Sequence, residues 1–136
     1  MKYLKKYKVF ELREETEEVD RILSILNDMC LDIRDLDLKA YILYNSSDLT
    51  HTDITLKIFK EIDSDNRFSL KLINSEIFQI VDFLKSEGWK VKRSLVSNAG
   101  SVYESKIENG KIICLYNDKE LLWEIEKFTI EFKKII

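Results

Sequence analysis

The single histidine of the chain, His51, lies in a polar segment that holds the side chains of acid–base chemistry. Residues 46–53 contain several hydroxyl groups and the carboxylates of Asp48 and Asp53. A histidine beside a carboxylate can act as a general base, with Asp53 or Asp48 orienting the ring. No nucleophile-elbow motif or other specific frame surrounds it. One hypothesis is therefore a small hydrolase or phosphodiesterase that uses His51 and Asp53, and a simple polar loop is the alternative.

Two short segments combine cations with aromatic rings, which is the combination that contacts phosphates and stacks on bases. They span residues 2–8 and 89–93, and their basic candidates are Lys5, Lys6, Lys8, Lys90, Lys92 and Arg93. Lysines of the same kind also protect edge strands against aggregation. The chain carries 22 basic and 25 acidic residues, a formal net charge of −3, and lacks the basic excess typical of DNA-binding domains. Nucleic acid is therefore the alternative partner and not the first.

Several classes of cofactor and metal site are excluded by residue type and spacing. A single histidine excludes H-E-x-x-H zinc sites, and the glycines at 88, 100 and 110 are too far apart for a phosphate-binding loop. Cys30 and Cys114 form no C-x-x-C motif and lie on apolar stripes, which predicts two reduced thiols in the core. The acidic residues do not follow the calcium-loop pattern. We expect no cofactor and no metal ion.

Length and composition predict one globular domain over residues 1–136. The chain has 45% hydrophobic and 35% charged residues, with no proline and three glycines. Its first residues lack the apolar run of a signal peptide, and no stretch approaches the roughly 18 apolar residues of a membrane span. These features predict a cytoplasmic protein.

The spacing of apolar residues predicts both helices and strands. Helical spacing predicts helices over 16–30, from Asn74 or Ser75 to just before Gly88, and over 118–136. Alternation predicts strands at 7–12 and 36–44, a hairpin over 54–73 and a strand that begins at Trp89. Asn109–Gly110 predicts a two-residue hairpin turn that pairs residues 103, 105 and 107 with 116, 114 and 112.

The resulting element order is (β)-α-βββ-α-βββ-α. Because strands and helices do not alternate strictly, this order predicts an α+β domain of two layers. We expect a largely antiparallel sheet of about six strands with three helices.

The predicted helix over 118–136 carries two apolar residues that do not fit its buried stripe. Trp123 and Ile130 fall opposite Leu121 at 100° per residue, and they share a face because they are seven residues apart. Aromatic anchors dominate protein interfaces. Trp123 and Ile130 are therefore the candidate partner-binding residues, and burial on both sides of the helix is the alternative.

Taken together, the residues favour a non-enzymatic protein-interaction module, such as an inhibitor, an immunity or anti-defence protein, an adaptor or a chaperone-like binding protein. The expected partner is another protein or a second copy of the chain, and no membrane. Nucleic-acid binding through residues 2–8 and 89–93, and hydrolysis through His51, are the two alternatives.

Overall fold

The computed structural model of the 136-residue chain describes residues 2–48, 51–60, 67–121 and 123–135, and only the backbone of residues 2–16, 47–48 and 51. Two α-helices occur in this part of the chain, α1 (Lys2–Arg34) and α2 (Asn74–Ser86), with the short 3₁₀ helix η1 (Leu70–Leu72) between them. The strands are β1 (Lys39–Asp48), β2 (His51–Phe59), β3 (Trp89–Asn98), β4 (Ser101–Glu108), β5 (Lys111–Cys114), β6 (Lys119–Glu120) and β7 (Lys127–Lys134).

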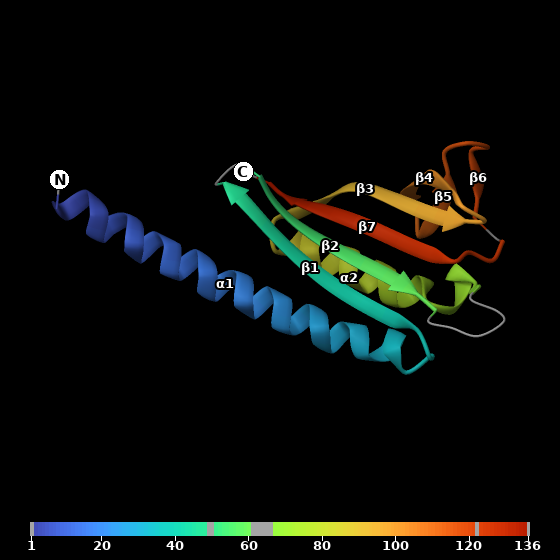
Figure 1. Ribbon diagram of the computed structural model, residues 1–136, viewed down its shortest axis with the longest axis horizontal. Helices are drawn as coiled ribbons and strands as arrows, with labels where there is room; N and C mark the ends of the chain where they lie inside the picture. Colours follow the sequence, from blue (N-terminus) through green and yellow to red (C-terminus); the bar gives the residue numbers. More distant parts are fainter. Residues whose placement is uncertain (1, 49–50, 61–66, 122, 136) are drawn as a thin grey trace.

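The strands form one open sheet in the order β1-β2-β7-β3-β4-β5-β6, and every pairing is antiparallel. Figure 1 shows α2 behind the central strands and α1 running beside β1. The predicted class, a two-layer α+β domain with a largely antiparallel sheet, is confirmed. Within the described residues, no helix is both long and apolar enough to cross a membrane.

The core lies between the two helices and one face of the sheet. Along β7, Phe128, Ile130 and Phe132 are buried, and alternate residues of β2 are buried in register with them. Alternate side chains of a strand point to opposite faces, so this pattern gives the sheet a helix-covered face and an open face. The helices contribute the other half of the core through Ile22, Leu26, Cys30, Ile33, Ile77, Ile80, Val81 and Leu84.

The N-terminal helix is longer than its apolar stripe. The helix predicted over 16–30 lies inside α1, whereas the predicted strand at 7–12 is wrong because those residues continue the same helix. Residues 2–34 contain no proline or glycine to end it. Figure 1 shows the N-terminal half of α1 projecting beyond the end of the sheet, and α1 and β1 diverging from the turn that joins them.

The predicted third helix over 118–136 is wrong, and the element order changes with it. These residues form β6 and the central strand β7. The apolar residues at 128, 130 and 132 have the period of a strand, whereas 128 and 132 alone also fit helical spacing from 121 and 125. Asn117 does not cap a helix. Its Oδ1 accepts a hydrogen bond from the Lys119 backbone N–H, and Asp118 has a positive φ of 55°, which together form a turn.

The predicted hairpin over 54–73 is also wrong in its pairing. Its first strand corresponds to β2, which pairs with β1 and β7 instead. The expected second strand contains a single bridge from Phe68 to Ile125 and then the 3₁₀ helix η1. The expected turn at 63–66 lies outside the described residues. The position beside β2 that the prediction gave to residues 68–72 is taken by β7 instead.

The hairpin predicted at Asn109–Gly110 is confirmed. Both turn residues have positive φ, 52° and 73°, as a type I′ turn requires. Ser105 pairs with Cys114 and Ile107 with Ile112, in the predicted register. The third predicted pair, Tyr103 with Tyr116, lies outside the ladder because β5 ends at Cys114. The helix that ends before Gly88 is confirmed as α2.

Candidate functional site

The candidate site is the outer edge of β1, which we call the β1 edge, because among the described strands β1 pairs only with β2. The first outward carbonyl of this edge is already bound. Arg34, at the end of α1, donates to the Ala40 carbonyl oxygen from Nη2 at 2.8 Å and from Nε at 3.2 Å. The Nη2 group also donates to Asn27 Oδ1 at 3.3 Å. The Ala40 carbonyl therefore points away from β2.

The direction of the Ala40 carbonyl fixes the directions of the other backbone groups of β1. Backbone N–H and C=O groups alternate between the two sides of an antiparallel strand, so those of Ile42, Tyr44 and Ser46 also point outward. A register shift between Ser46 and Asp48 then ends the regular segment. Within the described residues, the outward backbone groups of Ile42, Tyr44 and Ser46 form the unpaired part of the edge.

Apolar side chains flank this unpaired segment on both faces. Tyr41 and Leu43, each 50% exposed, lie on the open face, and the Tyr41 ring contacts that of Phe59 with 5.6 Å between centroids. Ile42 and the 40% exposed Tyr44 lie on the helix-covered face. Native edges are usually protected by charge, proline or a bulge. Residues 40–46 contain no charged residue and no proline.

No protein-family model and no curated protein matches the chain. No solved structure matches it either. The assignment of a function therefore depends on the geometry of this chain alone.

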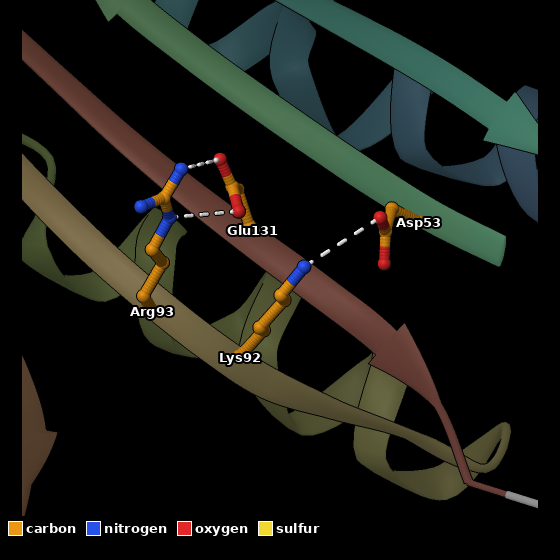
Figure 2. Close-up of polar contacts among 4 residues, drawn as sticks. All are labelled: Asp53, Lys92, Arg93 and Glu131. Carbon is orange, nitrogen blue, oxygen red and sulfur yellow. Dashed lines mark hydrogen bonds and ion pairs between the residues drawn. The ribbon is translucent and has the colours of Figure 1, made fainter. Parts of the chain in front are cut away.

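The predicted basic residues of β3 are engaged with carboxylates on the open face. A bulge between Val91 and Arg93 brings the Lys92 and Arg93 side chains to the same face, as Figure 2 shows. Arg93 makes a two-pronged contact with Glu131 on β7, at 2.9 and 3.1 Å. Lys92 reaches across β7 to Asp53 on β2, with 3.8 Å between Nζ and Oδ2 (Figure 2).

This ion-paired centre has two consequences. The hydrogen bond from Arg93 lowers the pKa of Glu131 below its ordinary value, and the bond to Glu131 raises the pKa of Arg93. Two of the cations expected to meet phosphates are therefore already paired with acids of the same chain. Nucleic-acid binding remains a prediction, for which Lys90 is an exposed cation at the start of β3.

The other predicted nucleic-acid residues, Lys5, Lys6 and Lys8, belong to α1, and their side chains lie outside the described part of the structure. They fall in the half of α1 that projects beyond the sheet in Figure 1. The structure therefore does not bring residues 2–8 and 89–93 onto one strand or one sheet face. The hypothesis that both segments bind one nucleic acid stays a prediction.

The proposed general base, His51, is the first residue of β2, where its backbone pairs with Asp48 of β1. The side chain of His51 lies outside the described part. Asp53 faces Lys92 in the ion pair of Figure 2. Hydrolysis through His51 stays a prediction, and no group of three or more His, Cys, Asp or Glu residues able to hold a metal ion occurs among the described residues.

The predicted partner-binding residues, Trp123 and Ile130, do not share a helix face, because residues 127–134 form the strand β7. Ile130 is 0% exposed in the middle of β7, so the exposure expected for it is wrong. Trp123 precedes β7, is partly buried against the core, and contacts the Tyr103 ring. A role for Trp123 in binding stays a prediction.

The two cysteines are buried and free, on α1 and β5. Burial raises the pKa of the Cys30 thiol, which makes it a poor nucleophile at neutral pH. The predicted burial of both thiols is confirmed.

Sequence reasoning did not identify the β1 edge as a site. The strand at 36–44 was expected, but its position at the end of the sheet depends on pairings that no local pattern encodes. The available signal was the run from Ala40 to Tyr44, which is apolar at every position and so leaves neither face of the strand with a charged residue.

Proposed function

We propose that the protein is a non-enzymatic protein-interaction module that binds through the β1 edge, and that its partner there is a second copy of the same chain. The observation that carries the proposal is the unprotected segment 42–46, whose outward backbone groups are flanked by apolar side chains on both faces. Strand addition at such an edge is a common mode of protein recognition.

Self-pairing of β1 satisfies the geometry of an antiparallel ladder. Outward residues must oppose outward residues, so a two-fold axis through Leu43 sets Ile42 opposite Tyr44 of the second copy. The same axis sets Leu43 against its own copy and Tyr41 against Asn45. No like charges face one another between residues 40 and 46 in this register.

In this arrangement the open faces of the two copies meet along β1. An axis perpendicular to the sheet keeps the helices of both copies on one side, so the open faces join into a continuous surface. Tyr41 and Leu43, half exposed in one copy, then lose water contact along the seam. Burial of apolar area at about 25 cal/mol per Å² supplies the main driving force.

Sedimentation equilibrium of the wild-type chain and of two matched variants tests the proposal. Leu43→Lys places two ammonium groups opposite each other at the axis, which disfavours pairing. Leu115→Lys is the control, because Leu115 is an equally apolar residue, 46% exposed, on the segment after β5. We expect dimers for the wild type and for Leu115→Lys, and monomers for Leu43→Lys with unchanged circular dichroism.

Two results would overturn the proposal. One is a wild-type chain that remains monomeric at the highest attainable concentration. The other is a Leu43→Lys variant that dimerises as well as the wild type, which would place the interface elsewhere.

A further inference from the structure

The open face of the sheet gathers cations on three adjacent strands, β2, β7 and β3. Alternate residues of a strand share a face, so the open-face residues lie between the buried residues of each strand. The charged residues placed there are the basic Lys57, Lys90, Lys92, Arg93, Lys127 and Lys133 and the acidic Asp53 and Glu131. The whole chain has a net charge of −3, so positive charge is concentrated on this face.

The two acidic residues of this face neutralise only part of its positive charge. Arg93 is paired with Glu131, and Lys92 with Asp53, as Figure 2 shows. Within the part of the chain that the structure describes, no ion pair engages the ammonium groups of Lys57, Lys90, Lys127 or Lys133. These four groups leave the face with positive charge available to an anion.

Two of these lysines stand directly opposite each other. Lys90 on β3 is the register partner of Lys133 on β7, and both are exposed. Like charges directly opposite each other in a sheet lower its stability. An anion bound between the two ammonium groups removes that cost, so this pair points to a negatively charged ligand.

The four lysines are spread along β7. Lys127 and Lys133 lie near its two ends, six residues apart, which is about 20 Å in a strand. Lys57 of β2 lies between them, opposite Thr129. A ligand that contacts all of these cations is therefore a linear polyanion, with its charges distributed along one strand.

Two aromatic rings lie on the same face near the Lys127 end of this row. Phe59 is opposite Lys127, and the half-exposed Tyr41 is opposite Lys57. The two ring centroids are 5.6 Å apart. A single-stranded nucleic acid uses both features, because its phosphates meet cations while its unpaired bases stack on rings. The bases of a duplex are already stacked on one another, and an acidic peptide has none.

We propose that the open face of β2, β7 and β3 binds single-stranded nucleic acid. The phosphates follow β7 from Lys127 to Lys133, and a base stacks on Tyr41. This activity is additional to self-association at the β1 edge and does not rest on it, because one copy of the chain carries all of these groups.

Fluorescence anisotropy of a labelled oligothymidylate of about twelve nucleotides tests the proposal over a series of salt concentrations. The logarithm of the binding constant should fall with the logarithm of the salt concentration with a slope of about −2 to −3, as expected for three or four phosphate contacts. A DNA duplex and an oligoglutamate peptide of matched length are the comparison probes, and both should bind more weakly. A face that merely attracts charge would favour the duplex, which has the higher charge density.

Charge variants assign the phosphate contacts. Lys90→Gln and Lys133→Gln should each weaken binding at low salt and make the salt slope shallower by about 0.7. Neither should unfold the chain, because each removes one member of a like-charge pair. Lys85→Gln is the matched control, since it makes the same change at an exposed lysine of α2, and it should leave the slope unchanged.

A ring variant assigns the stacking contact. Tyr41→Leu keeps an apolar side chain and removes the ring, so it should weaken binding at least about fivefold and leave the salt slope unchanged. Tyr116→Leu, at an 85% exposed tyrosine after β5, is the matched control and should bind as the wild type does. Both are measured in the Tyr44→Pro background, which removes an outward N–H of β1 and so prevents self-pairing.

The proposal is overturned if the oligothymidylate does not bind at low salt, or if Lys85→Gln weakens binding as much as Lys90→Gln. It is also overturned if the duplex or the oligoglutamate binds as tightly as the single strand, or if Tyr41→Leu binds undiminished. Tyr44→Pro alone should still bind the oligothymidylate as a monomer. Loss of self-association and loss of nucleic-acid binding are therefore separate results.

Discussion

The sheet ends in two edge strands that are built differently. At one end, β1 has ten residues, and its segment 40–46 has no charged residue and no proline. At the other end, β6 has only two residues, Lys119 and Glu120, both charged, and it follows a turn. Short, charged edges resist pairing with other chains, whereas long, apolar edges invite it.

The difference shows that edge protection in this fold is local. The β6 end is closed by its length and charge, whereas the β1 edge is bound by Arg34 at the Ala40 carbonyl and interrupted by the register shift between Ser46 and Asp48, with an uncharged segment between these points. Beyond that point the helix diverges from the strand (Figure 1). The contrast between the edges explains why we place the interaction surface at β1.

The largest expected effect comes from proline at an outward position of β1. The N–H of Tyr44 points away from β2, so Tyr44→Pro removes no hydrogen bond within the chain but removes a donor needed by a second copy. We expect self-association to weaken at least about 100-fold, about 2.7 kcal/mol, in a sedimentation-velocity dilution series. Leu43→Pro is the control. Its N–H points toward β2, so it should instead lower the stability of the monomer itself.

Removal of the Arg34 contact with the β1 edge should have an intermediate effect. Arg34→Met keeps the aliphatic part of the side chain and removes the donors to the Ala40 carbonyl. We expect a loss of about 1–2 kcal/mol in the free energy of unfolding, measured by urea denaturation. Because the interface uses residues beyond Ala40, self-association should persist. If it disappeared, the helix end and not the strand would be the binding surface.

A smaller effect is expected at the ion-paired centre between the two edges. Glu131→Gln weakens the contact with the half-exposed Arg93, so Tm should fall by a few degrees at most at pH 7. The pKa of Glu131 is lowered in the folded chain. The contact therefore stabilises the fold fully at pH values above 4.5, the ordinary pKa of a glutamate side chain. That stabilisation is lost as the pH falls through the depressed pKa. Thermal melts should therefore show the variant and the wild type converging in acid, and an unchanged difference would contradict this account.

The smallest expected effect is at the β6 edge. Lys119→Thr removes a charge from this edge but leaves it two residues long, too short for a stable ladder with another chain. Light scattering should give the same molar mass for this variant and the wild type. A gain in association would show that charge, and not length, protects this end.

The sequence predicted the elements whose signals are local. Gly88 ends α2, and Asn109–Gly110 fixes the register from Ser105–Cys114 to Ile107–Ile112, because positive φ at these positions favours few other residues. The same reasoning failed at the C-terminus, where the spacing of four residues between Phe128 and Phe132 fits a helix and also a strand. Ile130 was the residue that argued against a helix, because it lies opposite the helical stripe. In a strand it lies on the buried face together with Phe128 and Phe132.

The candidate site was harder to predict than the fold. Both surfaces depend on long-range pairing. The β1 edge exists because β7, from the C-terminus, inserts between β2 and β3. The open face gathers its cations because the same insertion sets Lys127 and Lys133 of β7 between Lys57 and Lys90. Trp123 was singled out for its residue type, and the structure gives it neighbours that its sequence position does not show.

Backbone hydrogen exchange of the wild-type chain tests the central claim most directly, because it needs no substitution. The amide protons of Ile42 and Tyr44 point outward from β1, whereas that of Leu43 points toward β2 and is the internal reference. The account predicts that exchange at Ile42 and Tyr44 slows at least about tenfold as protein concentration rises through the dimerisation range, while Leu43 changes little. Exchange at Ile42 and Tyr44 that stays fast and independent of concentration would contradict it.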